Sequence, residues 1–220
     1  MKSLRKFLII SAALISATAS HAQFGGLGGM LGGGGGGGDV SGEVAAFIAK
    51  SQVLSGLASR SVTAINAAFS SEEESAKKRA ALEAIDKITN TAEKEAKKAA
   101  LYESESAETK RKLESGEMEK AIGSLSEDKK KQVTAALLNF SIGALQAVDL
   151  VKTGQSLVQK VSTNPMDIPK VVPVKDALPL LSKVGSDAGG LFAGVIKLAR
   201  GAKISVPEVK SDSKPVDVTF

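Results

Sequence analysis

The sequence contains no cysteine and no tryptophan, and its only histidine, His21, lies close to the N-terminus. Without cysteine the chain can form no disulfide bond and can offer no thiolate to a metal ion. Beyond His21 there is no imidazole either, which removes the commonest general base and the usual zinc and copper ligands. We therefore expect a non-enzymatic protein with no catalytic residue, no cofactor and no metal site.

The first 22 residues have the pattern of a secretory signal peptide. Positive charges at Lys2, Arg5 and Lys6 precede an apolar run over residues 7–17. Ser20 and Ala22 then supply the small side chains that signal peptidase recognises. The apolar run is shorter than the roughly 20 residues of a membrane span. The sequence therefore predicts cleavage after residue 22 and a periplasmic or secreted protein.

Removing this segment changes the charge of the chain. The formal net charge of +5 includes the three basic residues of the signal, so the mature chain would carry +2. Residues 72–131 contain 15 acidic and 14 basic residues, and a run this balanced in charge is typical of a solvated helix face. A nucleic-acid platform requires a clustered basic face, so we expect no nucleic-acid partner.

Glycine is concentrated in one tract, because 11 of the 22 glycines fall within residues 25–38. Glycine loses the most backbone entropy on ordering, so a flexible linker is predicted over residues 23–40. The tract follows no strand and precedes no Gly-Lys-Ser/Thr, so it is not a phosphate-binding loop. Phe24 and Leu27 are among the apolar residues that interrupt it, which leaves open an arm that docks on a partner.

Residues 41–203 are expected to form an all-α domain, a bundle of about four helices. Its central helix is predicted at residues 126–161, where Ser126 can cap the N-terminus and apolar residues recur at helical spacing. Val133, Leu137, Phe140, Ala144, Val148 and Val151 form the first apolar stripe, and Leu138, Ile142 and Leu145 lie beside it. A helix this apolar is usually buried by other helices.

Two further helices are expected to pack with the central one. The first runs from residue 41 or 42 to 69. The second is capped by Asp176, has Pro179 in its first turn and continues to about residue 198. Within it, Gly190 and Gly194 have the four-residue spacing of closely packed helices, and the first helix is their expected neighbour.

The segment between the first and central helices is charged and free of glycine and proline over residues 71–115. Ser71 and Glu74 match a capping box at its start. An unbroken helix here would be about 65 Å long, so it projects, breaks or pairs with another chain as in a coiled coil. A turn within residues 116–125 would fold it against the central helix as a long charged hairpin.

Asp149 is an acid set among apolar neighbours, between Val148 and Leu150. One interpretation is a buried acid with a raised pKa, which would mark a functional site. The alternative places it at the rim of the bundle or beside Lys152. Together with Asn139 and other polar residues it also makes the central helix an expensive membrane span, so a buried bundle helix is favoured.

Val216, Val218 and Phe220 alternate along an extended tail predicted over residues 204–220. This ending resembles that of bacterial outer-membrane proteins, which finish in an aromatic residue after alternating apolar ones. It is also similar to the C-terminal ligands of PDZ domains, in which a strand adds to a sheet edge. Both resemblances imply a partner-binding C-terminus, and the other interpretation is an unstructured tail.

These patterns together predict an exported, non-enzymatic envelope protein that acts through helix-mediated protein–protein interaction. The partner would be a second copy in a homo-oligomer or another envelope protein. The alternative is a membrane-associated or membrane-inserting protein that uses the central helix or residues 178–199. Vesicle binding distinguishes the two hypotheses.

Overall fold

The computed structural model describes residues 40–162, 165–210 and 213–218, of which most are helical and none forms a β-strand. The predicted signal peptide and nearly all of the glycine-rich linker lie outside the described residues. The helices are α1 (Val40–Ala68), α2 (Glu72–Asp86), α3 (Thr91–Glu114), α4 (Glu117–Ile122), α5 (Glu127–Ser162), the 3₁₀ helix η1 (Pro165–Val171), α6 (Val172–Gly189) and α7 (Leu191–Gly201). The predicted all-α class is confirmed, but the described part has seven α-helices in place of about four.

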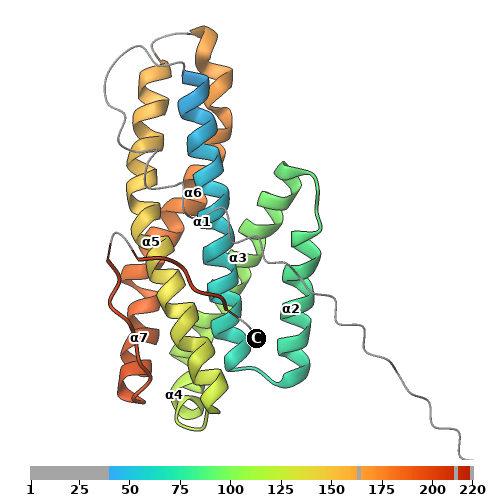
Figure 1. Cartoon of the computed structure of the whole chain (residues 1–220), viewed down its shortest axis with the longest axis vertical. Helices are drawn as coiled ribbons and strands as arrows, with labels where there is room; N and C mark the ends of the chain where they lie inside the picture. Colours follow the sequence, from blue (N-terminus) through green and yellow to red (C-terminus); the bar gives the residue numbers. More distant parts are fainter. Residues whose placement is uncertain (1–39, 163–164, 211–212, 219–220) are drawn as a thin grey trace, which may run out of the picture. The chain divides into compact units, whose positions relative to one another are not determined.

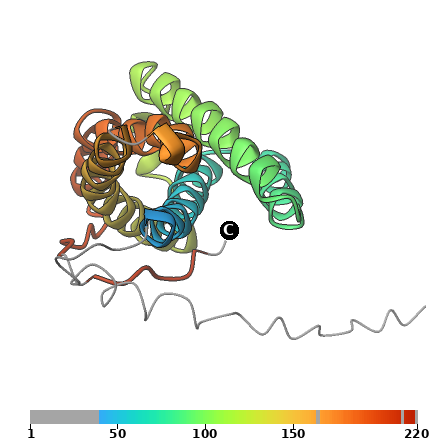
Figure 2. The same cartoon turned by 90° about the horizontal axis from the view of Figure 1, so that it is seen from above.

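Helices α1, α5 and α6 pack together around the apolar core (Figures 1 and 2). The bounds of α1 and α5 agree with the predicted first and central helices, and Ser126 caps α5 by accepting a hydrogen bond from the Lys129 N–H. The rings of Phe140 and Phe192 stack in the core. At Gly154 the helices approach so closely that an added Cβ would lie 2.7 Å from Phe47.

The opposite face of α1 packs on α3 through small and polar side chains. Ser59 Oγ donates a hydrogen bond to the Lys98 carbonyl, and Asn66 Nδ2 donates to the backbone carbonyl of Glu105. Both Ser59 and Asn66 are buried. Helix α1 is therefore enclosed by an apolar interface on one side and a hydrogen-bonded interface on the other.

The charged segment breaks, as one of the three predicted outcomes allowed. Helix α2 ends at Asp86, and Asn90 then caps α3 by accepting a hydrogen bond from the Glu93 N–H. The capping box of Ser71 and Glu74 is confirmed. The charged hairpin consists of α2 and α3, so the predicted pairing of one long helix with the central helix is wrong. Residues 116–125 do hold a change of direction, which contains α4.

The later helices differ from their predictions in position. Helix α6 begins at Val172 with Pro173 in its first turn, so Asp176 is not the cap and Pro179 lies inside the helix. A Cβ added to Gly194 would lie 2.6 Å from a methyl group of Leu113 on α3. The close packing expected of this glycine is therefore real, but its neighbour is α3 and not α1.

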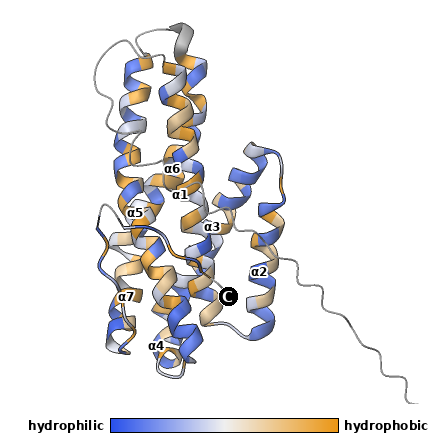
Figure 3. Cartoon of the chain, viewed as in Figure 1, coloured by the Kyte–Doolittle hydropathy of each residue, from blue (hydrophilic) through white to orange (hydrophobic). Residues whose placement is uncertain are grey.

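Helix α5 is the only helix in the described residues that is long and apolar enough to cross a membrane by length and composition alone. Apolar and polar residues both occur along it (Figure 3). About half of its most apolar window is buried within the protein, and Leu145 and Val148 are the large apolar side chains that it exposes.

Candidate functional site

The segment after α7 lies across the outer face of α5 and is held there by side chains of that helix (Figure 1). We call residues 204–210 the proximal limb and residues 213–218 the distal limb of this tail. Thr134 donates a hydrogen bond to the Ser205 carbonyl at 2.9 Å. The limbs have no regular secondary structure, yet Val206 and Val218 pack against the core.

Asn139 holds the distal limb by main-chain atoms alone. Its Nδ2 donates to the Val216 carbonyl at 2.7 Å, and its Oδ1 accepts from the Val216 N–H at 2.8 Å. The Asn139 side chain is buried, with only 3% of the residue exposed, whereas 44% of Val216 is exposed. A carboxamide that bonds both the N–H and the C=O of one residue makes the same pair of hydrogen bonds that a neighbouring β-strand would make. Helix α5 therefore carries a built site for an extended backbone.

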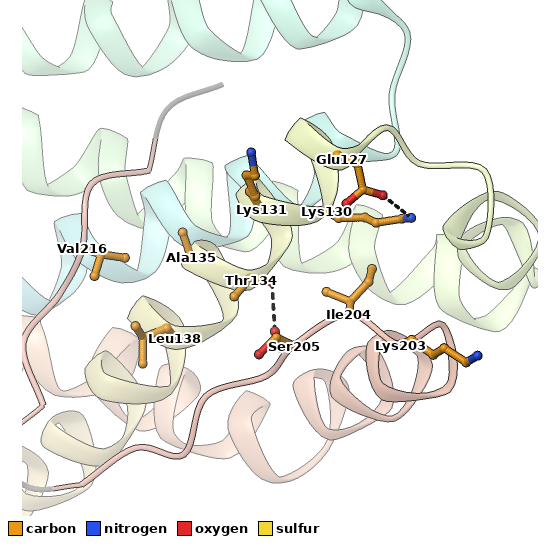
Figure 4. Close-up of a pocket in the computed structure, with 10 residues that line it drawn as sticks. All are labelled: Glu127, Lys130, Lys131, Thr134, Ala135, Leu138, Lys203, Ile204, Ser205 and Val216. Carbon is orange, nitrogen blue, oxygen red and sulfur yellow. Dashed lines mark hydrogen bonds and ion pairs between the residues drawn. The ribbon is translucent and has the colours of Figure 1, made fainter.

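A groove of about 450 Å³ lies between the limbs over α5, and we call it the tail groove. Its floor is mostly apolar, and Figure 4 shows Ala135 and Leu138 of α5 between Val216 on one side and Ile204 on the other. The remaining lining residues are Glu127, Lys130, Lys131, Thr134, Lys203 and Ser205. This volume lies within the roughly 300–1,000 Å³ typical of ligand pockets.

The rim of the tail groove is basic. Lys130 pairs with Glu127 at 2.8 Å, and this hydrogen bond holds the pKa of Glu127 below its ordinary value. Lys131 is mostly exposed and lies 3.6 Å from Asp128. Lys203, whose backbone adopts the left-handed conformation with φ 60°, makes no ion pair within the described residues. Three lysines and one glutamate thus surround an apolar floor.

A second groove borders the end of the distal limb. Its volume is about 690 Å³, and Asp217 lines it together with residues of α1, α2 and the start of α5. Glu72, Arg79, Asp128, Lys129 and Lys131 are its other charged residues, so charges of both signs are mixed there. Unlike the tail groove, this groove has no excess of basic over acidic residues.

The structure places the site residues predicted from the sequence in different environments. Val216 is hydrogen-bonded to Asn139 of α5, Val218 packs against the core, and Phe220 is outside the described residues. The interpretation of Asp149 as a buried acid is wrong, because 77% of its side chain is exposed and it lies 3.6 Å from Lys152. Asp149 faces solvent on the outer face of α5, as the rim interpretation expected.

Sequence reasoning missed the role of Asn139. In the sequence, Asn139 stands out only as a polar residue on an apolar helix that is expected to be buried. That observation argues against membrane insertion of the helix but does not identify a binding partner for the side chain. Since buried polar groups are almost always hydrogen-bonded, that signal could have been turned into a search for a partner. The partner, Val216, lies 77 residues away in the sequence, and no local pattern identifies it.

Two further polar clusters hold helices together. Lys78 of α2 bonds Glu105 and Glu108 of α3, and Lys112 reaches both Glu108 and Ser70. Tyr102 is fully buried and donates a hydrogen bond to Asp187 of α6 at 2.8 Å. These contacts join elements of the fold.

Within the described residues, no group of three or more acidic side chains is placed to hold a metal ion. A scan against protein-family models and searches of curated proteins and of solved structures found no match.

Proposed function

We propose that this is an exported, non-enzymatic protein that acts through protein–protein interaction, and that the tail on α5 is its interaction site. The observation that carries the proposal is the paired hydrogen bonding of Asn139 to the Val216 backbone. Hydrogen bonds to the main chain of an extended segment are what give strand-addition surfaces their affinity for peptides. Export is proposed from the signal pattern of residues 1–22.

The partner is a second copy of this chain or another envelope protein. The charged segment gives less reason to expect self-association than the sequence suggested, because α2 and α3 pack on α1 of the same chain. The tail groove is the stronger reason to expect a partner, since it has an apolar floor and a basic rim. An interaction through it needs only a short segment of the partner.

Site-specific photo-crosslinking in intact cells tests this proposal. A photoreactive residue at Leu138, in the tail groove, is expected to give one discrete adduct, and the same residue at exposed Lys175 on α6 is the matched control. An adduct of twice the chain mass assigns a second copy, and another fixed mass assigns a different protein. If Leu138 and Lys175 give the same diffuse pattern, the tail groove is not an interaction site.

Asn139→Ala provides the second arm of the test. It removes both bonds to Val216, so the adduct at Leu138 should weaken, whereas Gln146→Ala, an exposed polar change on the same helix, should leave it unchanged. An adduct that survives Asn139→Ala would show that the docked tail is not part of the surface.

Membrane association is the second candidate, favoured by the length and composition of α5 and by the exposure of Leu145 and Val148. Flotation of residues 23–220 with neutral and anionic vesicles tests it. Binding that is lost in Leu145→Ser/Val148→Ser would support this function. A chain that stays at the bottom of the gradient with both vesicle types would contradict it.

A further inference from the structure

We infer that the tail groove binds an extended, acidic peptide segment of the partner protein, which lies along α5 between the two limbs of the tail. This inference rests on the proposed function and names the chemistry of its partner. It draws on three separate observations: the shape and apolarity of the floor, the excess of positive charge at the rim, and the backbone N–H groups after Ser205 and Val216 that make no hydrogen bond within the described residues.

The floor accepts apolar side chains. Ala135 and Leu138 are half-buried residues of α5, and Ile204 and Val216 flank them (Figure 4). From Glu127 to Leu138 the groove follows α5 for about 17 Å at ~1.5 Å per residue. A strand advances ~3.3 Å per residue, so about five residues of an extended peptide would fit. Alternate side chains of such a peptide face the floor.

The rim determines the sign of the charge that binds. Lys130, Lys131 and Lys203 surround the groove, and Glu127 is the one acid among its lining residues. Lys203 has no acidic partner within the described residues, and Lys131 is paired only at 3.6 Å. Acidic side chains on the outward face of the peptide would lie near these lysines. The potential of the rim favours an acidic partner and disfavours a basic one.

Both limbs carry further backbone donors immediately after the residues that line the tail groove, Ser205 and Val216. Within the described residues, no hydrogen bond is made by the backbone N–H groups of Val206, Glu208, Val209 and Asp217. A helix with its side chains is about 10–12 Å wide, and strands pair at ~4.8 Å. Limbs on opposite flanks of α5 therefore leave room for one added strand between them.

Peptide binding to the mature chain, residues 23–220, tests the inference. The probe is a fluorescent seven-residue peptide of alternating glutamate and valine, and its binding is followed by fluorescence anisotropy. The matched probes replace glutamate by lysine or methylate alternate backbone nitrogens. We expect the acidic probe to bind at least tenfold more tightly than either matched probe. Equal binding of the acidic and basic probes, or of the methylated one, would overturn the inference.

Charge-reversal variants locate the site. Lys130→Glu and Lys203→Glu should each weaken binding of the acidic probe about tenfold, because each reverses a rim charge. Lys152→Glu is the control, since Lys152 is an exposed lysine of α5 that does not line the groove. A similar loss in Lys152→Glu would mean that the probe responds only to net charge.

The two proposals fail in different ways. If the acidic probe does not bind but Leu138 still gives a discrete crosslink, the tail groove has a partner of another chemistry and only the present inference is wrong. If the probe does not bind and Leu138 gives no discrete adduct, the interaction function is wrong as well. If a single-chain anionic detergent binds more tightly than the acidic probe, the tail groove is a site for an amphiphile, and the inference of a peptide ligand is wrong.

Discussion

At the scale of single residues, the buried polar side chains of this protein serve to join elements that are distant in the sequence. Asn139 links α5 to the tail, Asn66 links α1 to α3, and Tyr102 links α3 to α6. Each is fully or almost fully buried and hydrogen-bonded, as the cost of an unpaired buried group requires. Loss of one of these side chains should therefore loosen a specific pair of elements.

Tyr102 gives a prediction about alkaline pH. Burial, and then the hydrogen bond to Asp187, raise the pKa of Tyr102 well above its ordinary value of 10.0. Because the folded pKa is raised, the stabilisation is complete below pH 10 and is lost as the pH rises toward the folded pKa. Absorbance titration should show no tyrosinate in the folded chain at a pH where the urea-unfolded chain is ionised.

The control for this titration is Asp187→Asn, which removes the charged acceptor but keeps the burial. Tyrosinate should then form at a lower pH than in the unchanged chain, still above that of the unfolded one. A folded chain whose tyrosine ionises together with the unfolded chain would show that Tyr102 is accessible to solvent.

At the scale of elements, close contacts through glycine fix how α1, α5 and α6 pack. Gly154→Ala would place a methyl group 2.7 Å from Phe47 and 2.8 Å from Leu178. Because both neighbours belong to packed helices, we expect a loss of about 1–3 kcal/mol in the free energy of unfolding. Urea denaturation followed by circular dichroism measures this loss.

Gly42 in α1 is the matched control, since a Cβ there meets nothing within 4 Å. Gly42→Ala should leave stability unchanged or raise it by up to about 1 kcal/mol through helix propensity. Equal effects of the two changes would mean that the helices are not in close contact at Gly154.

Helix α2 is held to α3 mainly by charge. Burial opposes the charge on Lys78, but hydrogen bonds to Glu105 and Glu108 outweigh it and raise the pKa of Lys78. Burial also opposes ionisation of Glu108, but bonds from Lys112 and Lys78 outweigh it and lower the pKa of Glu108. Buried residues within α2 itself are only Ser75 and Ile85. Apolar packing therefore contributes little to holding this helix.

The pH dependence of α2 follows from these directions. The ionised Glu108 stabilises the fold at any pH above its ordinary pKa of 4.5. This stabilisation is lost as the pH falls through the lower pKa that Glu108 has in the folded chain. The stabilisation from charged Lys78 is complete below pH 10.5, its ordinary pKa, and is lost as the pH rises through the higher pKa of the folded chain. Amide exchange in α2 should therefore accelerate, relative to α5, when the pH is lowered from 4.5 through the folded pKa of Glu108. Uniform acceleration of both helices would contradict a local release.

Neighbouring lysines allow a substitution test of the same contact. Lys78→Gln removes the charge that faces the buried Glu105, and we expect α2 to lose about 2 kcal/mol of protection against exchange. Lys77→Gln breaks only the exposed pair with Glu73, and such a pair is worth less than about 1 kcal/mol. Comparable losses in the two variants would mean that α2 is held by something other than Lys78.

At the scale of the whole molecule, the tail is part of the fold and not an appendage. Ile204 is buried, Val206 and Val218 pack on the core, and Asn139 depends on Val216 for its hydrogen bonds. Ending the chain at Lys203 should lower the free energy of unfolding by about 2–4 kcal/mol, from lost apolar burial and an orphaned amide. Thermal denaturation by calorimetry measures the effect.

Val216→Ala is the control for the truncation. Its exposed side chain makes little contact and its backbone bonds are kept, so stability should change by less than about 0.5 kcal/mol. A truncated chain as stable as the full one would show that the tail is not bound to α5.

The sequence predicted what local patterns encode. Apolar spacing predicted α1 and α5, and Ser71 and Ser126 were identified as caps from their neighbours alone. The sequence does not decide whether the charged segment breaks before Asn90, because Glu, Lys and Ala favour helix on both sides of that point. The spacing of Asn90 and Glu93 is nevertheless that of a helix cap. The contacts of Asn139, Tyr102 and Gly194 depend on which helices meet, and no single segment contains that information.

The bonds between Asn139 and Val216 also imply a rule for how this protein can evolve. They involve only the main chain at position 216, so nearly any side chain there preserves them, and proline, which lacks the N–H, does not. As far as these bonds are concerned, descendants of this sequence should tolerate many side chains at position 216 while retaining asparagine at 139. The constraint would be visible in an alignment as one invariant residue facing a variable one.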